Sequence, residues 1–222
     1  MNYDAVVFDM DGVIVQRTPG WVFDEAAEET LTEFGVDDPT PFEFRAVRTL
    51  ATTVKQAKKH FDEERGLDFA ELWKARDELV TQKQEIAISH GEKDLYPDAQ
   101  AIRSLDVPLG VVSNNLQQAV ENAMTAFDMA PLFDVMYGLA PRLVDHSYRK
   151  PDATYLERAL SDLDADSAVY VGDRRSDVEA AHEAGIDAAL VRREFNQEIS
   201  FDDPIAFDVD SLHEIVQQLD EE

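Results

Sequence analysis

Short apolar runs alternate with segments of helical periodicity over most of the chain. The runs have the length of strands and are apolar throughout, as expected for a parallel sheet that is buried on both faces. They cover residues 5–8, 109–112, 135–137, 168–171 and 188–191. Helical patterns are found at about 116–127, 152–163, 175–184 and 211–220. This alternation predicts an α/β fold with a Rossmann-like, doubly wound parallel sheet.

One long stretch, from about Thr18 to Leu95, contains no pattern typical of a strand. Its apolar positions instead recur at helical spacing, for example over residues 23–34 and 69–88. We therefore expect a core domain made of residues 1–16 and 96–222, interrupted by an inserted all-helical cap domain of residues 17–95.

Four polar clusters stand out near the ends of predicted strands. They are Asp9 with Asp11 and Gly12, Ser113 with Asn114, Lys150 with Pro151, and Asp173 with Asp177. In open α/β sheets, ligands bind at the carboxyl ends of the strands. We therefore expect the four clusters to converge on one crevice.

The first cluster places two carboxylates, Asp9 and Asp11, directly after a buried strand. Such an arrangement is costly unless a cation compensates it, and Mg²⁺ favours carboxylate oxygens. Asp9 could then attack a phosphorus atom, and Asp11 could protonate the leaving alcohol. Taken alone, the cluster also fits a strand end that is simply capped by polar residues.

The other three clusters also have a functional and a simpler interpretation. Ser113 and the following amides could hold phosphate oxygens, or Ser113 could begin a helix as its N-cap. Lys150 could neutralise a phosphate, or it could be a surface lysine before a proline, Pro151, at the first helical position. Asp173 and Asp177 could serve one cation, or they could cap a helix.

In this order and spacing, the clusters resemble the four motifs of the haloacid dehalogenase superfamily of aspartate-nucleophile hydrolases. The resemblance covers nearly the whole chain, and the helical insert lies where the phosphoglycolate phosphatase-like and β-phosphoglucomutase-like branch carries its cap. It implies that Asp9 is the nucleophile and a metal ligand, and that Asp11 is the general acid–base and a further metal ligand. It also implies that Ser113 and Asn114 bind phosphate and that Lys150 stabilises charge. Asp173 is the remaining implied metal ligand, and Asp177 supports it.

The resemblance also bears on the reaction. True dehalogenases of the superfamily lack the second aspartate of the first motif, so Asp11 indicates phosphoryl transfer. The leading hypothesis is magnesium-dependent hydrolysis of a small phosphomonoester, such as phosphoglycolate or a sugar phosphate, through an aspartyl-phosphate on Asp9. The alternatives are a phosphomutase of the β-phosphoglucomutase type and a non-catalytic regulator that retains the fold.

Cations are needed where an anionic substrate binds, and three arginines are candidates for this role. Arg17 lies at the entrance to the insert, and Arg45 and Arg48 lie three residues apart on one predicted helix. The simpler interpretation of Arg45 and Arg48 is a helix-surface pair that bridges to nearby acids such as Glu43. Many relatives have Asp-Ser close to the position of Arg17, so the subfamily stays open.

The charge of the chain limits its partners. Forty-seven acidic residues face twenty basic ones, which gives a formal net charge of −27. Such a surface repels nucleic acid and anionic membranes. The acid is dispersed along the chain, as in proteins of extreme halophiles, where molar salt shortens the Debye length to about 3 Å. The alternative is an ordinary acidic protein.

Other features of the composition narrow the class further. The chain has no cysteine, which excludes disulfides, thiolate zinc sites and cysteine nucleophiles. It shows neither the basic start of a signal peptide nor an apolar run near the ~20 residues of a membrane span. We expect a cytoplasmic monomer or homodimer whose partner is a small phosphorylated metabolite.

Overall fold

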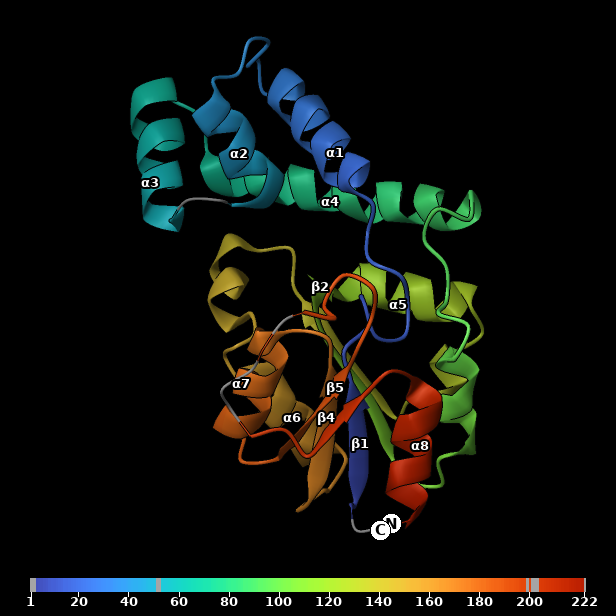
Figure 1. Cartoon of the computed structure of the whole chain (residues 1–222). Coiled ribbons are helices and arrows are strands. Elements are labelled where there is room, and N and C mark those ends of the chain that lie inside the picture. The colour runs from blue at the N-terminus through green and yellow to red at the C-terminus, as the bar shows by residue number, and fades with distance from the viewer. Residues whose placement is uncertain (1–2, 51–52, 199, 201–203, 222) are drawn as a thin grey trace. The chain divides into compact units, whose positions relative to one another are not determined.

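The computed structural model describes residues 3–50, 53–198, 200 and 204–221 (Figure 1). The chain forms two compact units. The sheet unit comprises Met1–Arg17, Asp94–Leu139 and Ser147–Glu222, and the helical unit comprises Thr18–Lys93 and Ala140–His146. None of the described helices is long and apolar enough to cross a membrane.

The sheet unit contains six strands in the order β3-β2-β1-β4-β5-β6, and every pair is parallel. The strands are β1 (Ala5–Phe8), β2 (Leu109–Leu116), β3 (Val135–Leu139), β4 (Ala168–Gly172), β5 (Asp187–Val191) and β6 (Phe207–Val209). The predicted fold class and five of the strands are confirmed. The sequence pattern missed β6, because three residues with an exposed Asp208 at the centre are too short to show a period.

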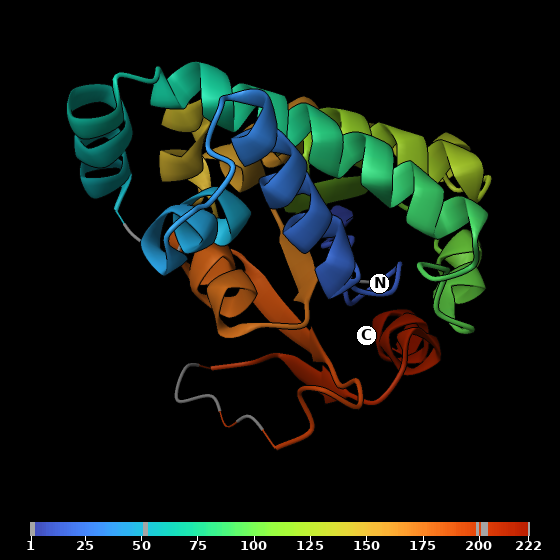
Figure 2. The same ribbon diagram turned by 90° about the horizontal axis from the view of Figure 1, so that it is seen from above.

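Helices cover both faces of the sheet (Figures 1 and 2). The long ones are α5 (Gln117–Ala126), α6 (Thr154–Asp162), α7 (Arg175–Glu183) and α8 (Leu212–Glu221), within two residues of the predicted bounds. Short helices of this unit are η2 (Ala99–Ser104) and η3 (Ala130–Leu132), while η4 (Leu143–Tyr148) begins in the helical unit and ends in the sheet unit. Residues of α6 and α7 pack against Val7 of β1 and Tyr170 of β4, and α8 lies on the opposite face.

The helical unit contains no strand within its described residues. Its helices are α1 (Gly20–Glu33), α2 (Pro41–Thr49), α3 (Val54–Lys58), the π-helix η1 (Lys59–Arg65) that continues α3, and α4 (Phe69–Ser89). Local sequence explains two of the helix starts. Thr40 and Glu43 form a capping box before α2, and the carboxylate of Asp68 accepts two amides at the start of α4. Helices α1 and α4 lie side by side in both views.

The capping residue Glu43 is also the centre of a charged cluster in the helical unit. Its carboxylate is fully buried and accepts hydrogen bonds from Arg65 Nε at 2.5 Å, His60 Nε2 at 2.8 Å and the Thr40 amide at 2.7 Å. Burial would raise the pKa of Glu43, but these hydrogen bonds outweigh it and lower the pKa to about 2. The stabilisation is therefore complete above the ordinary pKa of 4.5 and is lost as the pH falls towards 2.

We expect Glu43→Gln to lower the free energy of unfolding by about 2 kcal/mol, because a buried carboxylate with several donors is replaced by a neutral amide. Glu64→Gln is a matched control, since Glu64 binds the same His60 but is half exposed, and it should cost less than about 0.5 kcal/mol. Chemical denaturation of both variants measures the difference. Equal losses in the two variants would contradict the central role of Glu43.

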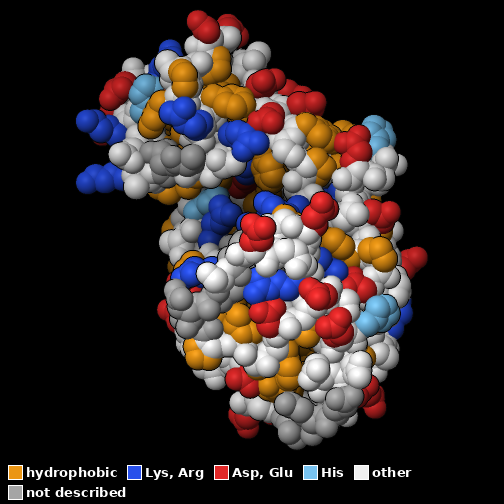
Figure 3. Space-filling view, in the orientation of Figure 1, with side chains coloured by type: hydrophobic (Ala, Val, Ile, Leu, Met, Phe, Trp, Pro, Cys, Tyr) orange, Lys and Arg blue, Asp and Glu red, His pale blue; other side chains and the backbone are white. Residues whose placement is uncertain are grey.

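The acidic side chains are scattered over the visible face of both units rather than gathered in one patch (Figure 3). Dispersed charges of one sign repel each other over about a Debye length, so salt relieves the repulsion. Raising KCl from about 0.1 M to about 2 M should increase the melting temperature by roughly 5–10 °C. Circular dichroism melts measure this, and a constant or falling melting temperature would argue against a salt-adapted surface.

Candidate active site

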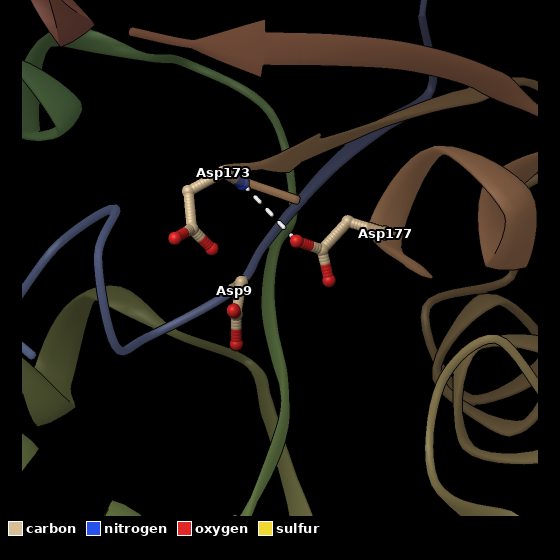
Figure 4. A group of neighbouring side chains, drawn as sticks. All are labelled: Asp9, Asp173 and Asp177. Atoms are coloured by element: carbon tan, nitrogen blue, oxygen red, sulfur yellow. Dashed lines mark hydrogen bonds between the residues drawn. The ribbon is translucent and has the colours of Figure 1, made fainter. Parts of the chain in front are cut away.

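Three buried carboxylates meet at the carboxyl end of the sheet. Asp9 follows β1 and Asp173 follows β4, the strand beside it, while Asp177 lies in the first turn of α7. One carboxylate oxygen of each residue lies within 4.8 Å of the other two, and all three carboxylates face the same space (Figure 4). The exposed fractions are only 6% for Asp9, 0% for Asp173 and 2% for Asp177. The two strand ends therefore bring together three acids that lie up to 168 positions apart in the chain (177 − 9).

Two glycines make this close approach possible. Gly12 has a φ of +95°, and a Cβ there would lie 2.5 Å from Asp173 Oδ2. A Cβ at Gly172 would lie 2.2 Å from the Cβ of Asp177. Because real side chains do not approach so closely, both positions require glycine for the carboxylates to keep their places.

Lys150 is the buried cation of the cluster. Its Nζ atom lies 3.0 Å from Asp9 Oδ1 and 2.7 Å from Asp177 Oδ1, and the side chain is almost completely buried. The interpretation of Lys150 as a surface lysine is therefore wrong. Pro151 is not at the first helical position either, because α6 begins at Thr154.

The buried ammonium of Lys150 and the half-exposed guanidinium of Arg174, whose Nε lies 3.5 Å from Asp173 Oδ2, do not neutralise three carboxylates. Burial raises the pKa of Asp9 to about 6, against the opposing effect of Lys150, and burial together with the charges of Asp9 and Asp177 raises the pKa of Asp173 to about 7. Burial would lower the pKa of Lys150, but Asp177 and Asp9 outweigh it and raise the pKa. The cluster thus holds an excess of buried negative charge that a further cation would relieve.

The donor atoms fit a divalent cation that prefers oxygen. Asp173 Oδ1 is buried and has no hydrogen-bond partner among the described residues. Asp177, in contrast, accepts the amides of Asp173 at 3.1 Å and Arg174 at 2.9 Å with Oδ2, and it faces Lys150 with Oδ1. Asp173 is therefore suited to bind Mg²⁺ directly, and Asp177 is suited to hold the loop and Lys150 in place.

We expect the affinity for Mg²⁺ to increase as the pH rises from about 5 to about 8, because protons on Asp9 and Asp173 compete with the cation and leave near pH 6 and pH 7. Without a cation, the free energy of unfolding should be highest below pH 3.8, where both carboxyl groups are protonated in the folded and unfolded states. It should fall as the pH rises through 6 to 7, because the folded state must then bury the carboxylate charges. The magnesium-dependent increase in melting temperature should therefore be larger at pH 8 than at pH 5. A pH-independent increase would contradict this assignment.

Asp11, the second aspartate of the first motif, is held in place by a residue of β2, the strand next to β1. Its Oδ2 accepts a hydrogen bond from Asn115 Nδ2 at 2.7 Å, and the Asn115 amide donates to Ser113 Oγ at 3.2 Å. The interpretation of Ser113 as a helix N-cap is wrong, because β2 continues to Leu116, which itself precedes α5 without a side-chain cap. Ser113 is buried within β2, two positions before Asn115, which holds Asp11.

Asn114 has a contact that the sequence motif did not indicate. Its Oδ1 accepts from the Lys150 amide at 2.8 Å, and its Nδ2 donates to the Lys150 carbonyl at 3.3 Å. The side chain of Asn114 therefore fixes the backbone of Lys150, in addition to any role of the Asn114 amide.

Further residues that the sequence reasoning missed lie beyond β5. Asn196 is buried and donates to the carbonyls of Asp173 at 2.8 Å and Val191 at 3.0 Å. Arg193 donates to the Val13 carbonyl at 2.8 Å and forms an ion pair with Asp98 at 2.8 Å. Both follow the carboxyl end of β5, so the rule applied to the other strands would have indicated them had it been applied to this strand as well.

The three candidate arginines belong to different units: Arg17 lies in the sheet unit, and Arg45 and Arg48 lie in the helical unit. Arg17 belongs to the sheet unit, and its guanidinium lies 4.7 Å from the centre of the Phe195 ring. Arg45 is exposed on α2, and Arg48 forms an ion pair with Asp24 of α1. The interpretation of a helix-surface arginine that bridges to an acid thus fits Arg48, but the named acid was wrong, since the ion-pair partners of Glu43 are His60 and Arg65.

Comparison with known proteins adds a family to this geometry. The family described as "Haloacid dehalogenase-like hydrolase" matches residues 6–191. A phosphoglycolate phosphatase of Rhodospirillum rubrum is 28% identical over 216 residues, covering 87% of this chain and 81% of the relative. An N-acetylmuramic acid 6-phosphate phosphatase of Pseudomonas aeruginosa is 25% identical over 194 residues, covering 86% and 83%.

The solved structures agree on the fold. The crystal structure of CbbY from Rhodobacter sphaeroides in complex with phosphate has a TM-score of 0.68 and 22% sequence identity, and the match covers 96% of each chain.

Proposed function

Because the chain belongs to the haloacid dehalogenase-like hydrolases, as its four motifs predicted, we propose that it is a magnesium-dependent phosphatase that hydrolyses a small phosphomonoester through an aspartyl-phosphate on Asp9. The observation that carries the proposal is the buried group of Asp9, Asp173 and Asp177 around the ammonium of Lys150. A binding module has no need of three costly buried carboxylates.

The first chemical step forms a bond between a carboxylate oxygen of Asp9 and the phosphorus atom of the ester. The bond from phosphorus to the alcohol oxygen breaks, and the alcohol leaves with a proton from Asp11. Lys150 and the Met10 amide, 3.0 Å and 2.8 Å from Asp9 Oδ1, hold this carboxylate in one orientation. The other carboxylate oxygen, Oδ2, is then the one that reacts.

In the second step, Asp11 takes a proton from water, and the water oxygen attacks the phosphorus atom of the aspartyl-phosphate. The bond between phosphorus and Asp9 breaks, so inorganic phosphate leaves and the carboxylate is restored. Asn115 keeps Asp11 in place for both proton transfers through its 2.7 Å hydrogen bond. The residues that begin the cycle are therefore unchanged at its end.

Asp9 and Asp173 are the side chains that would hold Mg²⁺, with the Asp11 carbonyl as the implied main-chain ligand. A bound Mg²⁺ neutralises negative charge on the phosphoryl oxygens. Ser113 and the Asn114 amide are the proposed phosphate-binding groups. Lys150 contributes a fixed positive charge next to the attacking carboxylate, where burial strengthens its effect.

The proposed substrates are small phosphate esters, because the named relatives act on phosphoglycolate and on a phosphorylated amino sugar. The test is phosphate release from a panel of phosphorylated metabolites and p-nitrophenyl phosphate, with magnesium and at high salt. Hydrolysis that depends on magnesium supports the proposal. Isomerisation that requires a trace of a bisphosphate would show a mutase instead. A protein that shows neither hydrolysis nor isomerisation would be a non-catalytic regulator.

A further inference from the structure

Tyr170 lies beneath the cluster, on β4, and is buried to 1% exposure. Its hydroxyl oxygen lies 2.6 Å from Lys150 Nζ and 2.6 Å from the carbonyl oxygen of Val112 on β2. Tyr170 contacts the site through the ammonium of Lys150. It belongs to none of the four motifs and has no role in the proposed reaction.

The hydrogen-bond directions at this hydroxyl are fixed by chemistry. The carbonyl of Val112 can only accept, so the proton of Tyr170 points to it and the lone pairs face Lys150. Burial, and after it the nearby carboxylates, raise the pKa of Tyr170 well above its ordinary value, so the phenol keeps that proton. Tyr170 is thus a neutral acceptor for the ammonium.

The ammonium of Lys150 has three protons and three close acceptors. They are Asp9 Oδ1 at 3.0 Å, Asp177 Oδ1 at 2.7 Å and the Tyr170 hydroxyl at 2.6 Å. The Val112 carbonyl is more distant from Nζ, at 3.3 Å. A neutral third acceptor satisfies the third proton of the ammonium. It does so without adding a fourth negative charge to the three buried carboxylates.

We propose that Tyr170 is a positioning residue, whose hydroxyl holds the Lys150 ammonium against the attacking carboxylate of Asp9. The inference rests on the proposed function, because its effect on rate requires Asp9 to be the nucleophile. Tyr170 does not touch the substrate, so its removal should act on the chemical step rather than on substrate binding.

Tyr170→Phe keeps the ring and removes only the hydroxyl. We expect kcat to fall about 10-fold to 100-fold, since a hydrogen bond to a charged group is lost, while KM changes by less than about threefold. Tyr137→Phe is the matched control: Tyr137 lies on β3 of the same sheet, but its hydroxyl binds Asp162 at the surface. That variant should keep the wild-type kcat.

A double-mutant cycle with Lys150→Met separates positioning from a general structural role. If Tyr170 acts through Lys150, Tyr170→Phe should change kcat by less than about twofold once Lys150 is absent. Equal losses in the two backgrounds would overturn the inference. Lys150→Ala replaces Lys150→Met in the cycle if the methionine variant does not fold, because it too removes the donor to Tyr170.

The wild type, the two single variants and the double variant also give a second cycle, calculated from their free energies of unfolding. This cycle needs no enzymatic activity. A clear coupling between positions 150 and 170 is expected, and its absence would overturn the inference even if the enzyme is a phosphatase. If the wild-type protein releases no phosphate from any ester, the proposed function fails, while this second cycle still reports on the contact itself.

Discussion

Asp9→Asn abolishes turnover and leaves the fold intact, if Asp9 is the nucleophile. The amide has the shape of the carboxylate but lacks a charged oxygen that can attack phosphorus. We expect kcat to fall by more than about 100-fold, which corresponds to at least ~2.7 kcal/mol in the barrier. Steady-state hydrolysis of p-nitrophenyl phosphate measures this loss.

Stability provides the internal check on this variant. The pKa of Asp9 is raised to about 6 by burial, so a neutral side chain is tolerated at this position without a cation. The melting temperature of Asp9→Asn should therefore match or exceed that of the wild-type protein at pH 8. Asp187→Asn, at an exposed position that begins β5, is the control for a neutralised aspartate and should keep full activity. An Asp9→Asn protein that retains more than about a hundredth of the wild-type kcat would exclude Asp9 as the nucleophile.

Asp173→Asn should weaken magnesium binding. Asp173 Oδ1 is a buried oxygen that has no hydrogen-bond partner among the described residues, and replacing Asp173 by Asn removes the negative charge that Mg²⁺ requires. Loss of a residue that only supports a metal ligand typically weakens metal binding about 10-fold to 100-fold. For the loss of a direct ligand, we expect the magnesium concentration for half-maximal activity to rise at least about 10-fold. A magnesium titration of activity, with magnesium-dependent melting as the second readout, measures the change.

Asp177→Asn distinguishes a ligand from its support. Asp177 uses its oxygens for Lys150 and for the amides of Asp173 and Arg174, so its replacement should lower stability and kcat more than magnesium affinity. An unchanged magnesium dependence in Asp173→Asn, or an effect on magnesium confined to Asp177→Asn, would exclude Asp173 as the direct ligand.

Much of the sheet unit was predictable because its information is local. Apolar runs such as Ala5–Phe8 end where a polar residue begins, and parallel pairing brings those ends to one edge. The same rule predicts that Asp9 and Asp173 lie close together, although they are far apart in the chain. The short strand β6 was missed because three residues carry no usable period.

The supporting contacts of the site were not predictable in the same way. Tyr170 belongs to an apolar run and gives no sign, in sequence, that its hydroxyl meets Lys150, twenty positions earlier. The partner of Glu43 was also predicted wrongly. Which cation a buried carboxylate meets depends on how helices pack, and His60 and Arg65 lie on a later helix.

The central claim is that the phosphoryl group passes through the carboxylate of Asp9. The most direct test is to quench the wild-type enzyme during turnover and reduce it with borohydride, which converts an acyl phosphate to an alcohol. Peptide mass spectrometry then identifies the modified position. We predict that the reduced residue is Asp9, and that the signal is absent in Asp9→Asn and without substrate. Reduction at another carboxylate, or at none while hydrolysis proceeds, would contradict the account.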